Sequence, residues 1–424
     1  NRSPLARERL RDQLAMVGRL PLEGLAIAKP LEQLRPPHVG YVMELVTGMT
    51  SLARLGRPPK GVPSVTQWFL ETGGLRRRLR VLARTAEVLS ELHGKGLTYV
   101  DPSPHNVFVS DSLDGDEVRL IDSDNLRPSS TASRALFTPG YGAPELVRGS
   151  GVSSTLSDAY AFAVIAFESL TLAHPLLGDL VRDGEPDLQD AAFAGELPWI
   201  DHPEDDRNRL SDGIPRALVL SSQLRDDFHA AFGLGLRAPD LRVGMSQWVE
   251  HLHRAADRTI VCSGCRGTFY VDREACPWCD GPRPPFVFIA AQLWDPSARR
   301  VKTGGDLEPA AGLVRDASGK PSVLDAVALS EGDALSLTER VTHGFAQGRP
   351  RVRVEYTGGR LTLTALGDTD ARLVSADGRQ NRPLSRGPAE LAVGAGSGDW
   401  LLHFGGDAEL HRVLRFDLRQ GVRP

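Results

Sequence analysis

The chain has few cysteines and lacks any long apolar run. Its four cysteines stand as two close pairs instead of being spread along the 424 residues as a disulfide framework would be. The longest apolar stretch, residues 159–170, contains Glu168 and is too short to span a bilayer. The first 20 residues are charged and predict an amphipathic helix, which excludes a signal peptide there. We therefore expect a cytoplasmic protein without membrane contact.

The chain also lacks an excess of charge of either sign. Its formal net charge is -4 and its pI is about 6.3, so we do not expect nucleic acid as a partner. The densest basic run comprises Arg76, Arg77, Arg78 and Arg80. We interpret this run as a solvated helix face.

What is present is the composition of a globular protein, with 41% hydrophobic and 25% charged residues. The length predicts two or three domains. Apolar periodicity predicts helices over 75–92 and 158–172, and short β-type runs at 107–109 and 118–121 predict a hairpin. Beyond about residue 285 the pattern becomes one of short strands separated by glycine-rich turns. The fold class is therefore multidomain α+β.

Two acidic residues stand beside these short β-type runs. Asp101 precedes the first run, Asp122 ends the second, and Asn106 follows Asp101 by five positions. Singly, each aspartate would be read as a turn former. Together they are the residue types that phosphoryl transfer needs, because one carboxylate must orient the attacking hydroxyl while an amide and a second carboxylate hold Mg²⁺.

These residues and their order resemble the eukaryotic-like (Hanks-type) protein kinases. The resemblance implies that Asp101 is the catalytic aspartate and that Asn106 and Asp122 ligate Mg²⁺ beside ATP. It extends over about the first 256 residues. The further matching motifs are Ala143-Pro144-Glu145 at the end of the activation segment, Asp158 as the brace of the catalytic loop, and Arg242 as the partner of Glu145.

The hinge that binds adenine in these kinases resembles residues 42–48. Met43 would be the gatekeeper, and the backbone around Glu44, Leu45 and Val46 would bond the base. Thr138, ahead of the Ala-Pro-Glu motif, favours serine and threonine over tyrosine as substrates.

The chain departs from this pattern at three places. Tyr99 replaces the usual histidine of the catalytic loop, which we expect to weaken a structural brace, and Ser103 replaces a lysine. The metal-binding triplet reads Asp122-Ser123-Asp124. In these features the chain is similar to an atypical bacterial subfamily that includes kinases of tellurite-resistance-type gene clusters. That resemblance implies a PP2C-type phosphatase and a von Willebrand A-domain (VWA) protein as partners, besides protein substrates.

The sequence shows neither a glycine-rich phosphate loop nor a strand lysine ahead of its first helix. It has five lysines, and Lys29 follows that helix. We therefore expect either that the small lobe is N-terminally truncated or that the chain is a pseudokinase scaffold. Glu8 or Asp12 would be the acidic partner of the ATP-binding lysine, or a surface charge. A small-molecule kinase of the aminoglycoside type also fits the three site residues but is disfavoured by Ala143-Pro144-Glu145 and Asp158.

The cysteines form two C-x-x-C pairs, Cys262 with Cys265 and Cys276 with Cys279. Four thiolates so spaced suit a closed structural Zn²⁺ site, and we predict a zinc ribbon folded by its metal. The rival interpretations are an iron site of the rubredoxin kind and two redox pairs.

The C-terminal part is predicted to be a β-sandwich or barrel. The stretch from Gly332 to Gly396, through Thr342-His343, Gly358-Gly359 and Gly378-Arg379, resembles a forkhead-associated (FHA) domain, which implies a phosphopeptide ligand. The serine and asparagine contacts typical of that family cannot be placed here, so a plain interaction or packing domain is the alternative.

The predicted organisation is thus a kinase-like domain over 1–256, a zinc ribbon over 257–284 and an all-β module over 285–424. Within the first domain, 1–47 is the partial small lobe and 48–256 the large lobe. The predicted activity is transfer of the γ-phosphoryl group of ATP to serine or threonine of proteins in bacterial signalling. Its cofactors would be ATP, Mg²⁺ and Zn²⁺.

Overall fold

The computed structural model describes residues 4–131, 136–298, 312–345, 348–375, 378–394 and 400–421. The chain divides into two compact units, Asn1–Ala256 (unit 1) and Asp257–Pro424 (unit 2). Among the described residues, no helix combines the length and the apolar character that crossing a membrane would require.

The first part of unit 1 contains one helix and short strands. Helix α1 spans Pro4–Val17, and strands β1 (Glu32–Gln33) and β2 (Tyr41–Val42) pair antiparallel. A second sheet has the order β3-β5-β6, with bounds Met49–Ser51, Val107–Ser110 and Val118–Leu120. Its β5–β6 hairpin confirms the one predicted from the apolar runs.

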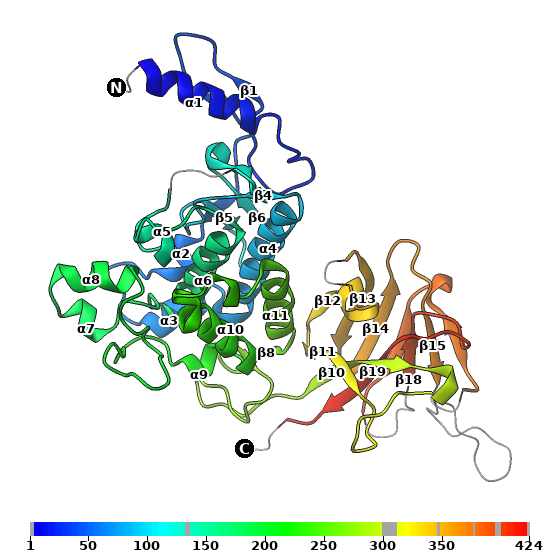
Figure 1. The fold of residues 1–424 in the computed structure, drawn as a ribbon. Helices are drawn as coiled ribbons and strands as arrows, with labels where there is room; N and C mark the ends of the chain where they lie inside the picture. Colours follow the sequence, from blue (N-terminus) through cyan, green and yellow to red (C-terminus); the bar gives the residue numbers. More distant parts are fainter. Residues whose placement is uncertain are drawn as a thin grey trace. The chain divides into compact units, whose positions relative to one another are not determined.

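Helix α6 (Thr155–Thr171) lies at the centre of the large lobe (Figure 1). Every residue from 157 to 171 is buried, because helices α2, α4 and α10 pack around it. The predicted apolar helix is thus confirmed. The other helices are α2 (Ala53–Gly56), α3 (Val65–Glu71), α4 (Gly74–Gly94), α5 (Pro144–Val147), α7 (Asp179–Arg182), α8 (Pro186–Phe193), α9 (Arg216–Val219), α10 (Ser222–Phe232) and α11 (Met245–Asp257). Short elements complete the unit: strands β4 (Leu97–Thr98) and β7 (Arg127–Pro128), and 3-10 turns η1 (Ser123–Asn125), η2 (Leu234–Leu236) and η3 (Pro239–Leu241).

The arginine run at the start of α4 is not a solvated face, so that interpretation is wrong. Arg78 is fully buried, and burial lowers its pKa to about 9. Its guanidinium donates to the carbonyls of Leu55, Phe69 and Gly74 at 3.0–3.1 Å and lies 4.0 Å from the ring centroid of Phe69. The carbonyls of Leu55 and Phe69 lie in the last turns of α2 and α3, where helix ends leave carbonyls without intrahelical partners, and Gly74 begins α4. A cation with five donors therefore links three chain segments.

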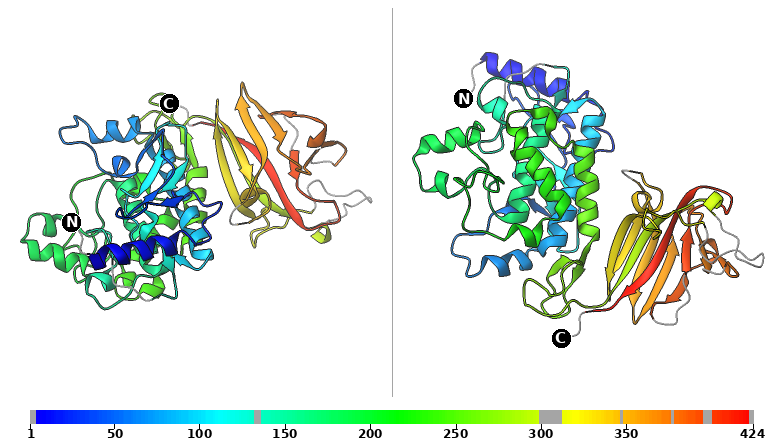
Figure 2. Two further views of the ribbon diagram at one scale, coloured as in Figure 1. Left: turned by 90° about the horizontal axis from the view of Figure 1, so that it is seen from above. Right: turned by 60° about the horizontal axis from the view of Figure 1, so that its bottom comes forward.

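Unit 2 begins with the cysteine-rich segment and continues as two antiparallel sheets (Figure 2). The hairpin of β8 (Thr259–Val261) and β9 (Thr268–Tyr270) carries the first cysteine pair in its turn. One sheet has six strands in the order β11-β10-β19-β18-β15-β16, and the other has four in the order β12-β13-β14-β17. Their bounds are β10 Phe286–Trp294, β11 Val323–Ser330, β12 Ala334–Thr338, β13 Pro350–Thr357, β14 Arg360–Ala365, β15 Arg372–Ser375, β16 Asn381–Pro383, β17 Ala389–Ala392, β18 Trp400–His403 and β19 His411–Arg419. Within this unit lie also α12 (Glu339–Thr342), η4 (Pro296–Ala298) and η5 (Leu384–Arg386).

The two sheets share one apolar core, which makes the module a sandwich. Val352, Val354 and Tyr356 of β13 are buried while the residues between them are more exposed, as expected of a strand with one face on a core. Strands β10 and β19 contribute Val287, Ile289 and Leu414 to the same cluster. The predicted all-β character of this region is confirmed.

Candidate functional site

The loop between β4 and β5 is held by a buried carboxylate. The backbone N–H groups of Tyr99 and Val100 donate to Asp158 at 2.7 and 2.9 Å, and His93 Nε2 lies 3.0 Å from the same side chain. Val100 has a φ of 83°, a strained value for a β-branched residue. The fixed carboxylate in the first turn of α6 stabilises that conformation. The brace predicted for Asp158 is therefore confirmed.

Tyr99 does not weaken the loop, contrary to the expectation from the missing histidine. Its hydroxyl donates to the carbonyl of Ile121, immediately before Asp122. Burial and the neighbouring Asp122 and Asp101 raise the pKa of Tyr99 well above its ordinary value, so the hydroxyl keeps its proton. Since the phenol reaches the end of β6, it joins the catalytic loop to the metal-binding triplet.

The three predicted site residues lie around the β5–β6 hairpin. Asn106 donates from Nδ2 to the carbonyl of Asp101 at 3.2 Å and accepts from the backbone N–H of Ile121 at 2.9 Å. Asp101 accepts from the backbone N–H and the hydroxyl of Thr138, at 2.7 and 2.8 Å. The fold thus ties Asp101, Asn106 and the residue before Asp122 into one network.

Asp122 follows β6 in the left-handed conformation, with φ 58° and ψ 49°. Partial burial, and then the nearby carboxyl of Asp124, raise the pKa of Asp122 to about 6. Oδ1 of Asp124 is buried without a hydrogen-bond partner among the described residues. Two adjacent carboxylates with an unsatisfied oxygen, beside Asn106, form a donor set of the kind that Mg²⁺ prefers.

Helix α1 contacts this segment through a residue that the sequence did not single out. Gln13 donates from Nε2 to the carbonyls of Asp124 and Leu126, at 3.0 and 3.3 Å. Gln13 directly precedes Leu14, which is buried. Its place on the inward side of α1 was the feature of the sequence that could have identified Gln13 as a contact residue.

The two acids proposed on α1, Glu8 and Asp12, are exposed. Lys29 instead forms an ion pair with Glu23, with Nζ and Oε1 3.6 Å apart. Within the described part of the chain, no ion pair links Lys29 to α1.

The hinge segment follows β2 as an irregular stretch. Met43 and Leu45 are 42% and 81% exposed, and Glu44 pairs with Arg119 at 2.6 Å. Among the described residues, the backbone groups of 44–46 have no hydrogen-bond partner. The structure therefore leaves both apolar side chains and backbone donors accessible along this edge.

The end of the activation segment is fixed by two buried contacts. Arg242 donates bidentately to Glu145 at 2.7 and 2.8 Å, which confirms the predicted pair. The Tyr141 hydroxyl donates to Glu168 of α6 and accepts from Arg57 at 2.9 Å. Burial and Glu168 raise the pKa of Tyr141, so this donor stays protonated.

The four cysteines form a second candidate site, in unit 2. Their sulfur atoms all lie within 4.8 Å of one another, and two pairs, Cys262–Cys279 and Cys265–Cys276, are 3.6 Å apart. Burial raises the pKa of the Cys276 thiol. Burial also opposes ionisation of Cys262, but the backbone N–H groups of Cys265 and Gly264, together with hydrogen bonds from Cys279 and Cys276, lower its pKa to about 7. The cluster is not isolated, since Cys262 and Cys276 share a buried core with Ile260, Phe269, Phe286 and Ala328.

Comparison with known proteins agrees with this geometry. Serine/threonine-protein kinase pkn2 of Myxococcus xanthus is 36% identical over 130 residues, which are 29% of this chain and 15% of that protein. The DNA damage-responsive serine/threonine-protein kinase RqkA of Deinococcus radiodurans is 26% identical over 253 residues, 58% of this chain and 34% of that protein. CBL-interacting protein kinase 4 of Oryza sativa is 31% identical over 200 residues, 41% of this chain and 39% of that protein.

The chain thus spans between 15% and 39% of the length of these three relatives. Residues 39–206 match the family described as protein kinase domain, a range that includes Asp101, Asn106, Asp122 and Asp158. The chain therefore contains a protein kinase domain, and the relatives of that domain are serine/threonine kinases.

Proposed function

We propose that the chain is a serine/threonine protein kinase that transfers the γ-phosphoryl group of ATP to protein hydroxyls in bacterial signalling. The observation that carries this proposal is the binding of two backbone N–H groups of the catalytic loop by Asp158. A loop fixed in this way can hold a carboxylate in one position, and phosphoryl transfer depends mainly on positioning and charge.

In this proposal Asp101 orients the substrate hydroxyl and accepts its proton. The contact of Thr138 with Asp101 supports a serine or threonine substrate, because it keeps the substrate-binding segment beside the base. Asn106 and Asp122 would hold Mg²⁺, which neutralises phosphate charge when bound. The free backbone groups at Glu44–Val46, with Met43, would bind adenine.

Substitution of Asp101 and of Asp122 by asparagine tests these roles. We expect Asp101→Asn to lower autophosphorylation of the full chain by about 10²–10⁴-fold, the usual worth of a positioned acid–base group. Asp122→Asn should lower it as well, because it removes a carboxylate that would hold Mg²⁺. Asp114→Asn, in the exposed β5–β6 turn, is the matched control and should keep the native rate. Native rates in both site variants would show that the roles are assigned to the wrong residues.

We also propose that the cysteine cluster binds one structural Zn²⁺. Four sulfurs within 4.8 Å fit the tetrahedral arrangement in which Zn–S bonds are about 2.3 Å long. Metal analysis of the purified chain should give one zinc per chain, and Cys276→Ser should lower that ratio. Iron in place of zinc, or no metal, would exclude the assignment.

A pseudokinase scaffold is the second candidate function. It is favoured by the ion pair of Lys29 with Glu23, which engages this lysine away from α1. Unit 2 would then recruit partners: a phosphopeptide, as the FHA resemblance implies, or the PP2C-type phosphatase and VWA protein of related clusters. The discriminating measurement is phosphate transfer by the native chain with Mg-ATP. A scaffold would bind a phosphothreonine peptide more tightly than its threonine counterpart yet incorporate no phosphate.

A further inference from the structure

The large lobe contains a cavity that none of the roles above uses. It has a volume of about 680 Å³ and is formed by residues of the 199–215 segment, α9 and α10. None of its lining residues belongs to the catalytic loop, the metal-binding triplet or the hinge. Its volume lies within the range of sites for small organic ligands.

One part of the cavity wall is apolar. Trp199, Leu210, Leu220 and Phe228 line it, and each is at most 7% exposed. Trp199 is further fixed by the ring of Phe167 on α6, 6.0 Å away in an edge-to-face arrangement. This wall is part of the packed core, so it is preformed and does not have to be ordered when a ligand binds.

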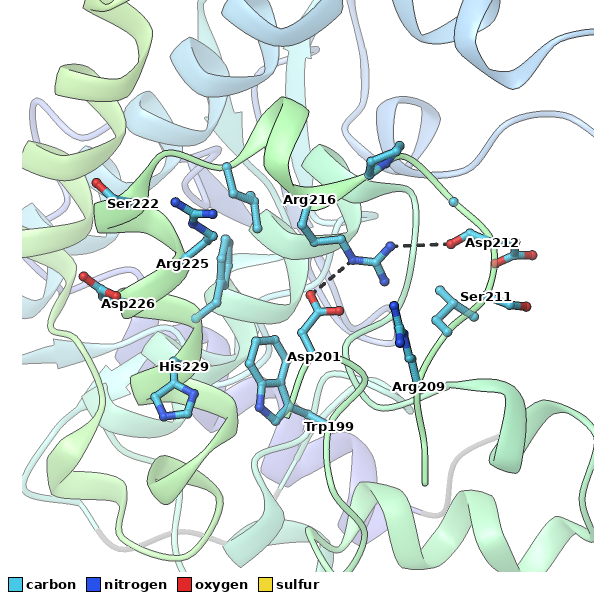
Figure 3. Close-up of a pocket in the computed structure, with 15 residues that line it drawn as sticks. Trp199, Asp201, Arg209, Ser211, Asp212, Arg216, Ser222, Arg225, Asp226 and His229 are labelled. Atoms are coloured by element: carbon cyan, nitrogen blue, oxygen red, sulfur yellow. Dashed lines mark hydrogen bonds and ion pairs between the residues drawn. The ribbon is translucent and has the colours of Figure 1, made fainter. Parts of the chain in front are cut away.

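The other part of the wall consists of arginines (Figure 3). Figure 3 shows Arg225 on the α10 side of Trp199, with Arg209 and Arg216 on the opposite side. Arg209 and Arg225 are exposed, and neither forms an ion pair with another described residue. Two guanidinium groups are thus free to bind a ligand.

Arg216 is held in a fixed orientation at the centre of this wall. Its Nε donates to Asp201 at 3.1 Å, and Nη1 lies 3.4 Å from the carbonyl of Asp212. The remaining nitrogen, Nη2, is buried without a hydrogen-bond partner among the described residues. A buried donor without an acceptor is costly, and a ligand oxygen would remove that cost.

The aspartates of the cavity do not cancel these cations locally. Asp201 is engaged by Arg216, and Asp212 pairs with Arg182 at 2.9 Å. Asp226 lies on the outer side of α10, and Figure 3 shows its carboxylate directed away from Trp199. Two of the three lining aspartates are therefore already paired with arginines, and the third is directed away from the apolar wall.

We propose that this cavity binds a small organic anion, in which one phosphate or carboxylate group is attached to an apolar ring. Arg209, with Nη2 of Arg216, binds the anionic group, because guanidinium groups match the planar oxygen pairs of such anions, and Arg225 adds a positive charge on the other side of the apolar wall. The wall of Trp199, Leu220 and Phe228 covers the ring. Asp201 acts as a positioning residue that orients Arg216.

Ligand-observed NMR on the full chain tests this assignment with four probes: phenyl phosphate, phenylacetate, inorganic phosphate and benzyl alcohol. We expect at least one aromatic anion to bind at about millimolar concentration, the affinity reached by fragments of this size. Inorganic phosphate and benzyl alcohol should bind at least 10-fold more weakly, because each lacks one half of the recognised chemistry. The stronger of the two aromatic anions decides between phosphate and carboxylate as the natural group.

The variant Arg209→Gln/Arg225→Gln should weaken binding of that anion at least 10-fold. Arg207→Gln is the matched control, since Arg207 is equally exposed, pairs with Asp205 and does not line the cavity. Unchanged binding in the double variant, or binding of benzyl alcohol or inorganic phosphate as tight as that of the aromatic anions, would overturn the proposal. Binding at the ATP site would not respond to these arginines. The readout involves no phosphoryl transfer, so its failure leaves the proposed kinase activity untouched.

Discussion

The two units of the chain use different means to fix their functional segments. In unit 1, single buried polar side chains reach across the sequence: Asp158 holds the catalytic loop, Arg242 holds Glu145 and Arg78 joins three segments. In unit 2, the sandwich is held by strand pairing, and β10 pairs along its length with β19. Unit 2 depends on a few residues at two places: the cysteine cluster, and the buried Arg340, which pairs with Asp325 of β11 and with Asp257. Loss of one side chain should therefore be severe at the loops of unit 1, at the cysteine cluster and at Arg340, and milder at the solvent-facing positions of the paired strands.

The largest effect is expected at the cysteine cluster. Zinc removal by a chelator, or Cys276→Ser, should destabilise unit 2 by at least about 5 kcal/mol, because the folding free energy of small zinc sites comes from the metal. Differential scanning calorimetry should show a lower melting temperature for the transition of unit 2. Ser263→Ala, within the first cysteine pair, is the control. A chelator without effect would mean that the apolar core around Phe269 and Phe286 suffices.

The next largest effect is expected at the buried pair of Arg242 and Glu145. Arg242→Met leaves a buried carboxylate without its partner and should cost about 3–5 kcal/mol in unfolding of unit 1. Combining it with Glu145→Gln should recover part of this loss. Glu250→Gln, which breaks an exposed pair with Arg254, should cost about 0.3–0.5 kcal/mol. If Arg242→Met and Glu250→Gln lowered the free energy of unfolding equally, burial of the pair would not be what makes the first contact important.

A smaller effect is expected from Tyr99→Phe, which deletes the hydroxyl bound to the Ile121 carbonyl. The loss of one neutral hydrogen bond should lower the free energy of unfolding by about 1 kcal/mol. Because this bond joins the catalytic loop to Asp122, the rate of autophosphorylation should fall by a larger factor than the stability change alone explains. Tyr270→Phe, in unit 2, is the control for removing a tyrosine hydroxyl. A variant with the native rate would show that Tyr99 only fills the core.

The smallest effect is a pH dependence of stability at Asp122. Its folded-state pKa of about 6 lies above the ordinary 3.8, so the folded state binds the proton more tightly than the unfolded chain. The stability from this group is therefore present at low pH and is lost as pH rises from about 4 to 6. Asp122→Asn cannot ionise and should be more stable than the native chain above pH 6, by less than about 1 kcal/mol because solvent screens this group. Thermal melts should show that the stability gained by Asp122→Asn vanishes near pH 4. A gain of equal size at pH 4 and above pH 6 would show that it does not come from ionisation of Asp122.

Much of the fold follows from the sequence because it depends on local patterns. The short strands predicted beyond about residue 285 are present, for example as β14 and β15, because alternation and glycine turns leave little choice there. The predicted helix over 75–92 agrees with α4 to within two residues at each end. The contacts of Gln13 and Tyr99 were missed, because they depend on carbonyls contributed by segments more than 20 residues away.

The sequence by itself predicted Asp101, Asn106 and Asp122 as site residues and the four cysteines as one cluster, since each prediction depends on residue types at short spacing. Only the tertiary structure decided the burial of Arg78, the role of the Tyr99 hydroxyl, the pairing of Lys29 with Glu23 and the cavity beside Trp199. The physical reason is that hydrogen bonds and desolvation depend on which distant backbone groups meet a side chain. Spacing along the chain does not contain that information.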